Sequence, residues 1–364
     1  MLQGRTTACE NKSRMTRRRH QPPSSPGLHR KSAAPPSLFC DMWLRMCREA
    51  AALPLLVVVV CLWCGSNVCA AQGSRLNDRP IIGVLAQENL PEDIFAQGSS
   101  YIAASYVKYL EGSGARVAPI RINLTEAEYT KLFQSINGLL LPGGDVDIET
   151  SEYSRAAKIL YKLALKANND QDYFPIWGTC QGFQQLSVFT ANKNLLTLTD
   201  TKSVALPLNF TREARSSRLF RGFPKDLLQA LAEENITSNF HSWSLSMQNF
   251  SQNSKLKKFY QILSTNTDGK TEFISSMEAY RYPFYAVQYH PEKSPFEWLD
   301  KPGMVHTTSA TKASFYTASF FVSEAMKNNH HFPSVEEEEK ALIYKYIPVF
   351  TSMDFYFIQN YYFD

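Results

Sequence analysis

Short apolar segments alternate with helical patterns between residues 81 and 191, and this alternation restricts the fold more than any other feature. The segments that predict buried strands are 81–86, 115–120, 138–142 and 174–177. The segments between them that predict helices are 101–110, 124–133 and 153–165. Strands that alternate with helices form right-handed βαβ units. The sequence therefore predicts an α/β fold with a doubly wound, mostly parallel central sheet flanked by helices.

The second half of the chain is less regular. Strands are predicted at 195–198, 273–276 and 284–288, and a helix with a wide apolar face at 311–327. The charged residues 336–340 are expected to form a solvated helical face that leads into another helix. The aromatic tail, residues 355–364, is expected to pack on the body of the protein or on a second subunit.

The N-terminal region has the pattern of a secretory signal peptide. Residues 54–64 form an apolar run that Arg45 and Arg48 precede, and small residues allow cleavage after Ala70 or Ala71. We expect residues 1–71 to be an upstream extension and signal peptide, and residues 72–364 to be a single domain with no stable membrane insertion after cleavage. An uncleaved membrane anchor is the alternative.

Removal of residues 1–71 changes the charge of the protein. That segment holds ten of the 38 Lys and Arg residues and three of the 34 Asp and Glu residues, which leaves 28 basic and 31 acidic residues. The formal charge becomes −3 in place of +4. No basic excess remains that would indicate a nucleic-acid partner.

Four N-glycosylation sequons support the secretory route, and they begin at Asn123, Asn209, Asn235 and Asn249. Together with the signal peptide, they predict a glycoprotein of the secretory pathway that is delivered to the lysosome, the extracellular space or both.

A single cysteine remains after the predicted cleavage, because six of the seven cysteines precede residue 72. Cys180 follows the predicted strand 174–177, lies between Gly178 and Gly182, and opens a helical pattern at Gln181. Secreted proteins usually pair their cysteines, so a lone thiol needs another explanation. A strand–Cys–helix turn exposes the side chain at the carboxyl edge of the sheet, and the helix N-terminus favours the thiolate. We interpret Cys180 as a nucleophile on such an elbow; a structural cysteine is the alternative.

A thiolate nucleophile requires an acid–base partner, and His290 is the best candidate of the five histidines after residue 71. His290 follows the predicted strand 284–288, and Pro291 fixes the loop. Glu292 lies two residues further on, where its carboxylate can accept the imidazole N–H and orient the ring. Cys180, His290 and Glu292 are therefore predicted as the catalytic residues.

Gly143 and Gly144 follow the predicted strand 138–142 and can present backbone N–H groups to a developing oxyanion. The N–H of Gln181 is predicted as the second donor. One cysteine cannot build a Cys/His zinc site, so the sequence predicts neither a metal nor a cofactor.

Together these residues resemble the class I glutamine-amidotransferase-like family and, within it, the gamma-glutamyl hydrolases. The segments that carry the resemblance are 80–84 (PIIGV), 101–110 (YIAASYVKYL), 141–144 (LPGG), 175–183 (PIWGTCQGF), 239–244 (NFHSWS), 265–270 (TNTDGK) and 288–293 (QYHPEK).

The resemblance covers residues 79–364 and implies hydrolysis of γ-glutamyl bonds in folyl- and antifolate poly-γ-glutamates. It implies that Cys180 is the nucleophile, with His290 and Glu292 as base and acidic partner, and that His241 is a second histidine lining the cleft. Gln184 departs from the family pattern, which often has an acidic residue there. The resemblance also permits a homodimer.

Two other functions remain open. A glutaminase-type amidotransferase subunit would use the same catalytic parts, although the signal peptide and sequons oppose a cytosolic synthetase partner. A non-catalytic secreted binding glycoprotein could keep the fold without the chemistry.

Overall fold

The computed structural model describes residues 76–89, 91, 93–353 and 355–364, which all belong to one compact unit, Gly73–Asp364. The predicted signal peptide, its cleavage site and the alternative membrane anchor lie outside the described residues. Across the part of the chain that is described, no helix has the length and apolar character needed to cross a membrane.

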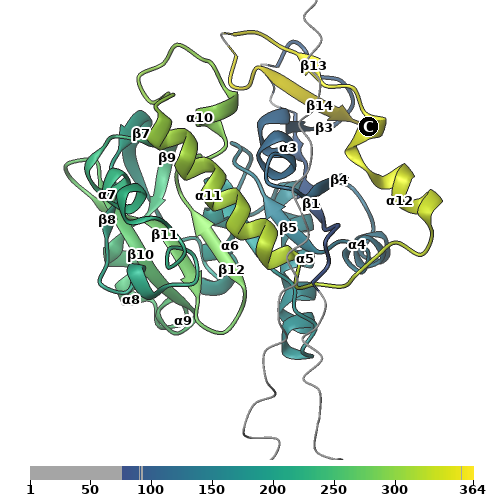
Figure 1. Cartoon of the computed structure of the whole chain (residues 1–364), viewed down its shortest axis with the longest axis horizontal. Helices are drawn as coiled ribbons and strands as arrows, with labels where there is room; N and C mark the ends of the chain where they lie inside the picture. Colours follow the sequence, from purple (N-terminus) through teal and green to yellow (C-terminus); the bar gives the residue numbers. More distant parts are fainter. Residues whose placement is uncertain (1–75, 90, 92, 354) are drawn as a thin grey trace, which may run out of the picture. The chain divides into compact units, whose positions relative to one another are not determined.

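An eight-stranded sheet forms the centre of the protein (Figure 1). Its strands, in spatial order, are β4 (Arg116–Ile120), β1 (Ile81–Leu85), β5 (Gly138–Leu141), β6 (Ile176–Thr179), β12 (Phe284–Val287), β11 (Glu272–Ala279), β10 (Tyr260–Thr267) and β8 (Asn209–Phe210). The first five strands are parallel, and β11, β10 and β8 continue the sheet in antiparallel pairs. The predicted α/β fold with a mostly parallel sheet is confirmed.

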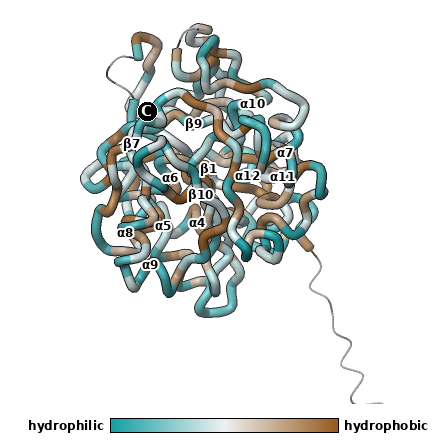
Figure 2. The backbone as a smooth tube through the Cα atoms, turned by 90° about the vertical axis from the view of Figure 1, so that its left-hand side faces the viewer, coloured by the Kyte–Doolittle hydropathy of each residue, from teal (hydrophilic) through white to brown (hydrophobic). Residues whose placement is uncertain are grey.

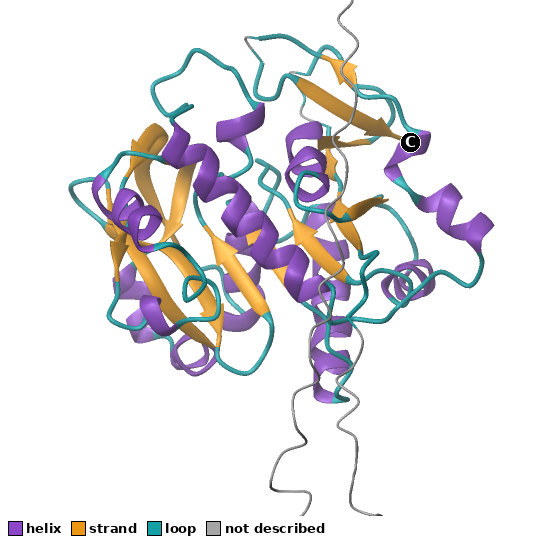
Figure 3. Cartoon of the chain, in the orientation of Figure 1, coloured by secondary structure: helices purple, strands orange, loops and turns teal. Residues whose placement is uncertain are grey.

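Helices cover both faces of this sheet, so that it is doubly wound (Figure 3). The helices on one face are α3 (Ala104–Glu111), α7 (Lys225–Glu233) and α11 (Thr308–Ala325). Those on the other face are α4 (Glu126–Phe133), α5 (Glu152–Asn169), α6 (Gln181–Ala191) and α9 (Ser254–Phe259). Successive strand residues serve opposite faces: Leu140 packs with α3 and α11, whereas Leu139 and Leu141 pack with α5 and α6. This accounts for the uninterrupted apolar runs from which the strands were predicted.

Shorter helices complete the surface of the unit. They are α8 (Met247–Gln252), α10 (Lys293–Phe296) and α12 (Val335–Ala341). Helix α12 contains the charged residues 336–340 and has no buried residue, so this run is a solvated face, as expected, but lies within the helix rather than before it. Helix α9 is mostly hydrophilic (Figure 2), because it contains three lysines and Ser254, and its buried residue is Leu256.

The predicted helix 101–110 is wrong at its start. Ser100–Ala103 form strand β3, and α3 begins only at Ala104. Strand β3 lies in a second sheet of order β13-β14-β3-β2, between β2 (Gln87–Glu88) and β14 (Gln359–Phe363), with β13 (Val349–Phe350) at the edge. Pairing with a strand from the far end of the chain outweighs the local helical pattern. The same pairing shows that the aromatic tail packs on the body of the protein.

A two-stranded ribbon forms a third sheet. Its strands are β7 (Leu196–Leu206) and β9 (Thr237–Leu245), which pair in antiparallel fashion. The predicted strand 195–198 is only the start of β7, and β9 was not predicted. Strand β9 buries Asn239, His241 and Ser244. Because these buried residues are polar, β9 lacks the apolar alternation that marks a strand in the sequence.

Candidate active site

Cys180 occupies a strained turn between β6 and α6. Its backbone φ is +50° and its ψ is −105°, in the region that residues other than glycine rarely adopt. Its N–H donates to the carbonyl of Val287 at 2.9 Å, which ties the turn to β12. A Cβ on Gly182 would lie 2.1 Å from the carbonyl oxygen of Leu141, so only glycine permits this close approach. The geometry is that of a nucleophile elbow.

His290 lies on the loop that follows β12. Its N–H donates to the carbonyl of Ser238 at 2.8 Å, and its ring Nδ1 lies 2.7 Å from Glu292 Oε1. Both side chains are buried, with 3% and 0% of their surface exposed. A carboxylate can only accept, so Nδ1 carries a proton and donates to Glu292. Nε2 is then the nitrogen left to exchange a proton with a reacting group.

The side chains of Cys180 and His290 converge on Gly143. A Cβ on Gly143 would lie 2.7 Å from His290 Cε1 and 3.2 Å from Cys180 Cβ, so glycine leaves the space in which they meet. Burial lowers the pKa of His290, but the negative charges of Glu292 and the Cys180 thiolate outweigh burial and raise this pKa to about 9. The arrangement therefore favours the protonated form of His290 beside the Cys180 sulfur.

Tyr106 of α3 joins this pair to the loop after β5. Its hydroxyl accepts the N–H of Gly143 at 2.8 Å and lies 3.4 Å from His290 Nδ1. Burial and the negative charge of Glu292 raise the pKa of Tyr106 well above its usual value, so the hydroxyl keeps its proton. In the sequence, Tyr106 is only one position of the predicted helix 101–110, and no motif around it indicates its role.

The predicted oxyanion residues lie together at the carboxyl edge of the sheet. The N–H of Gly143 is engaged by Tyr106, so its assignment as an oxyanion donor stays a prediction, with Gly144 next to it as the less constrained position. The side chain of Gln181 donates to the carbonyl of Val146 and accepts from Gln87 Nε2 at 3.0 Å. The elbow and the loop after β5 are thus in direct contact.

His241 lies on β9, in a polar and fully buried environment. Its Nε2 lies 3.1 Å from Asn239 Oδ1, and its Nδ1 lies 2.9 Å from Thr201 Oγ1. The amide nitrogen of Asn239 donates to the carbonyl of Thr237 at 2.8 Å, which turns Oδ1 toward Nε2, while Nδ1 also lies 3.1 Å from the carbonyl oxygen of Trp243. Burial and the positive charge of His290 lower the pKa of His241 to about 3. His241 is therefore neutral, and it lies close enough to His290 for the positive charge of His290 to lower its pKa.

Comparison with known proteins agrees with this geometry, since residues 80–292 match the Peptidase C26 family. The chain belongs to that family. The gamma-glutamyl hydrolase of Rattus norvegicus is 55% identical over 312 residues, covering 85% of this chain and 98% of the rat protein. The gamma-glutamyl hydrolase of Mus musculus is 58% identical, covering 79% and 90% of the two chains. That of Homo sapiens is 53% identical, covering 84% and 98%.

Within this Peptidase C26 chain, Gln184 lies one helical turn after Cys180. Its Nε2 donates to the carbonyl of Trp243 at 2.7 Å and lies 3.5 Å from Gln288 Oε1. The indole of Trp243 is half exposed, whereas Gln184 is buried. Gln184 therefore joins α6 to the β7–β9 ribbon at the edge where the catalytic residues lie.

Lys293 is a buried charge that directly follows the loop with His290 and Glu292. Its Nζ lies 3.3 Å from the carbonyl oxygen of Tyr356 and 4.1 Å from the ring centre of Phe357. Burial lowers the pKa of Lys293, while Glu297 and Glu292 oppose the shift. The Lys293 contacts connect this loop to the C-terminal tail, and the sequence identifies the lysine only as part of the segment 288–293.

The four sequons of this C26 chain differ in exposure. Asn123, Asn209 and Asn235 are exposed. Asn249 is half-buried, and its Nδ2 donates to the carbonyl of Leu195 at 2.8 Å and to Thr197 Oγ1 at 3.0 Å. Only the first three present a free surface for a glycan.

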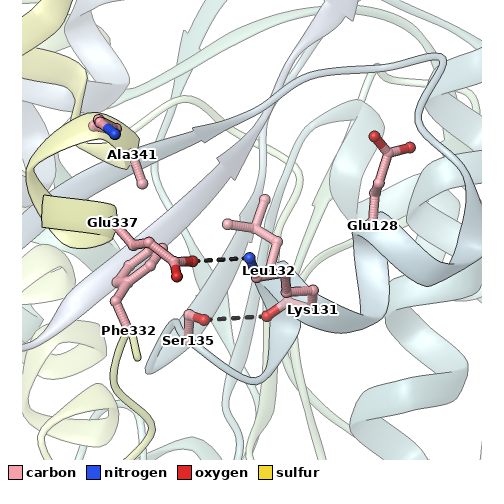
Figure 4. A pocket seen from close by; sticks show the side chains of 8 residues that line it. Glu128, Lys131, Leu132, Ser135, Phe332, Glu337 and Ala341 are labelled. Atoms are coloured by element: carbon pink, nitrogen blue, oxygen red, sulfur yellow. Dashed lines mark hydrogen bonds and ion pairs between the residues drawn. The ribbon is translucent and has the colours of Figure 1, made fainter. Parts of the chain in front are cut away.

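A surface cavity of about 310 Å³ lies between α4 and α12 (Figure 4). Lys131 and Glu337 form an ion pair of 2.8 Å across it. The cavity contains none of the predicted site residues of the C26 domain. Among the described residues, no group of three or more His, Cys, Asp or Glu side chains is placed to hold a metal ion.

Proposed function

We propose that this chain hydrolyses the γ-glutamyl bonds of folyl- and antifolate poly-γ-glutamates, with Cys180 as nucleophile. The observation that carries the proposal is the buried convergence of Cys180, His290 and Glu292 within a Peptidase C26 domain. Relatives that are 53–58% identical are gamma-glutamyl hydrolases, which supports a cysteine peptidase-type hydrolase acting on γ-glutamyl bonds.

The reaction begins with attack of the Cys180 thiolate on the γ-carbonyl carbon of a glutamyl residue. A C–S bond forms, and the carbonyl oxygen takes up the negative charge. Backbone N–H groups at Gly144 and Gln181 donate to this oxyanion. As the oxyanion collapses, the C–N bond breaks and His290 gives its Nε2 proton to the leaving amine. The products of this half-reaction are a free amine and a thioester on Cys180.

Water completes the reaction. Neutral His290 takes a proton from a water molecule, whose oxygen attacks the thioester carbonyl. The second oxyanion occupies the same site, and its collapse breaks the C–S bond, releases a carboxylic acid that gives its remaining proton to the solvent, and restores the thiolate–imidazolium pair. Glu292 holds the ring in place and stabilises its positive charge. His290 carries the proton of each half-reaction.

We also propose that the protein is a glycoprotein of the secretory pathway, which acts in the lysosome, the extracellular space or both. The predicted signal peptide and the exposed sequon residues Asn123, Asn209 and Asn235 support this location. A homodimer is compatible with the proposal and is tested by the mass of the purified protein in solution.

The test is mass spectrometry of the products that form from a pteroyl-pentaglutamate with the purified, processed protein and its Cys180→Ala variant. We expect cleavage by the wild type only, and the product lengths distinguish internal from terminal cleavage. Hydrolysis of free glutamine in place of this substrate would identify an ammonia-producing relative. No turnover of either compound would favour a binding protein, and turnover by Cys180→Ala would refute the proposed nucleophile.

A further inference from the structure

A buried glutamine contacts both predicted oxyanion positions. Gln87 begins β2, two residues after Leu85, the last residue of β1, and only 2% of its surface is exposed. Strand β2 pairs with β3, with Gln87 opposite Tyr101. Because Gln87 follows a parallel strand, its side chain enters the site at the same edge as the elbow and the loop after β5.

The side-chain amide of Gln87 lies directly against Gly144. A Cβ on Gly144 would fall 2.3 Å from Gln87 Cδ, 2.4 Å from Nε2 and 2.6 Å from Oε1, so the amide occupies the space that any other residue would need. The same amide donates through Nε2 to Gln181 Oε1 at 3.0 Å. Gln181 in turn donates to the carbonyl of Val146, two residues after Gly144. One amide therefore connects the two segments whose N–H groups would bind the oxyanion.

The amide of Gln87 has an energetic cost that packing alone would not require. Its Oε1 is buried and has no hydrogen-bond partner among the described residues. A buried acceptor without a partner destabilises the folded protein, and such groups often mark functional positions. Methionine would fill a similar space with no unpaired atom. The amide must then contribute to the structure of the site through its hydrogen bond to Gln181.

We propose that Gln87 is a positioning residue that sets the separation between the Gly144 and Gln181 N–H groups. This inference rests on the proposed function, since it concerns the oxyanion of that reaction. Oxyanion donors act only when they lie about 2.7–3.1 Å from the developing charge, so small displacements weaken them. The charge exists only in the transition state and the tetrahedral intermediate. Loss of the Gln87 amide therefore lowers kcat and leaves substrate binding and the resting thiolate intact.

The variants are Gln87→Met, which keeps the volume and removes the hydrogen bond, and Gln87→Glu, which places two acceptors opposite each other at Gln181. Gln185→Met is the matched control. Gln185 is also a fully buried glutamine with an unpaired Oε1, and its Nε2 bonds to the carbonyl of Ile148 and to Ser154 Oγ, each at 3.0 Å. Its loss has a similar structural cost without any contact to Gly144.

Three quantities are measured for the processed protein and each variant: kcat and KM for a pteroyl-pentaglutamate, the rate of Cys180 alkylation by iodoacetamide, and the thermal midpoint. Alkylation needs the thiolate but no oxyanion site. Removal of one oxyanion donor costs about 100- to 1,000-fold in kcat, and a displaced donor should cost about 10- to 100-fold. We expect this loss for Gln87→Met, a larger one for Gln87→Glu, and KM and alkylation within threefold of wild type.

A kcat of Gln87→Met within twofold of wild type would overturn the inference and leave the proposed function standing. The same holds if Gln185→Met loses as much kcat, or if alkylation slows in parallel with kcat, because both results indicate a general disturbance of the site. Failure of the wild type to cleave the substrate would overturn the proposed function and, with it, this inference.

Discussion

Replacement of Tyr106 by phenylalanine removes one oxygen atom from the centre of the site and keeps the ring. That oxygen accepts the Gly143 N–H at 2.8 Å and lies 3.4 Å from His290 Nδ1, and 1% of the residue is exposed. The substitution leaves the buried Gly143 N–H without this partner. The loss of that hydrogen bond costs about 1–3 kcal/mol.

Part of this cost is expected to appear in catalysis. The loop with Gly143 and Gly144 loses its hydrogen bond to α3, and the His290 ring loses the hydroxyl that lies 3.4 Å from its Nδ1. If about 1.4–2.7 kcal/mol of the loss falls on the transition state, kcat decreases about 10- to 100-fold. We expect KM to change little, because none of these contacts is made to the substrate.

The assay compares kcat, KM and urea unfolding of Tyr106→Phe with those of Tyr129→Phe. Tyr129 is a matched control on α4: its buried hydroxyl accepts the N–H of Leu124 at 3.3 Å and donates to the carbonyl of Arg121 at 3.2 Å. Both variants should lose similar unfolding free energy, but only Tyr106→Phe should lose kcat. An unchanged kcat for Tyr106→Phe, or an equal loss in the control, would refute the reasoning.

Three further predictions concern protonation and glycosylation. The pKa of His241 is about 3 in the folded state and 6.5 when unfolded, so the free energy of unfolding decreases as the pH drops through this range. Urea unfolding should show that the wild type loses unfolding free energy from pH 7 to 4.5, and that His241→Gln loses about 2–3 kcal/mol less. Equal losses in the two proteins would contradict this prediction. The pKa of His290 is raised to about 9, so kcat/KM should fall as the pH rises through 9. In Glu292→Gln this decrease should occur at lower pH. If it occurs at the same pH, Glu292 is not the cause of the raised pKa. Enzymatic deglycosylation in ¹⁸O-water, followed by peptide mass spectrometry, should label Asn123, Asn209 and Asn235. Asn249 should not be labelled, because its side-chain amide already donates hydrogen bonds within the protein. Equal labelling at Asn249 would disprove this prediction.

The parts of the fold that the sequence predicts are those specified by local pattern. Strands β1, β5 and β6 are short apolar runs, and α5 has a strong helical period, so each is recognisable without its neighbours. Strand β3 was assigned to a helix because its partner, β14, lies more than 250 residues further along the chain. Strand β9 was missed because its buried residues satisfy one another through hydrogen bonds rather than by apolar contact.

In the site, too, the sequence predicts the residues that lie in local motifs and misses those that act through distant contacts. Cys180, His290 and Glu292 each follow a strand in a short motif, so their residue types and spacing were sufficient to propose them. Tyr106 and Gln87 act through contacts to residues that are distant in the chain, and no local spacing encodes such contacts. His241 was found only through the family resemblance, because its environment depends on the β7–β9 pairing.

These distant residues are a physical requirement of a buried ionic site. A thiolate, an imidazolium and a carboxylate interact strongly where water is excluded, but each loses its hydration and needs replacement partners. Glu292 is partnered by the His290 ring and by the charge of Lys293, which the C-terminal tail holds in place, while the hydroxyl of Tyr106 on α3 lies against His290 and holds the Gly143 loop. The catalytic residues can therefore reach their working geometry only after α3, the ribbon and the tail have packed around them. Grafting Cys180, His290 and Glu292 alone onto another α/β sheet should consequently give a folded protein with little hydrolysis.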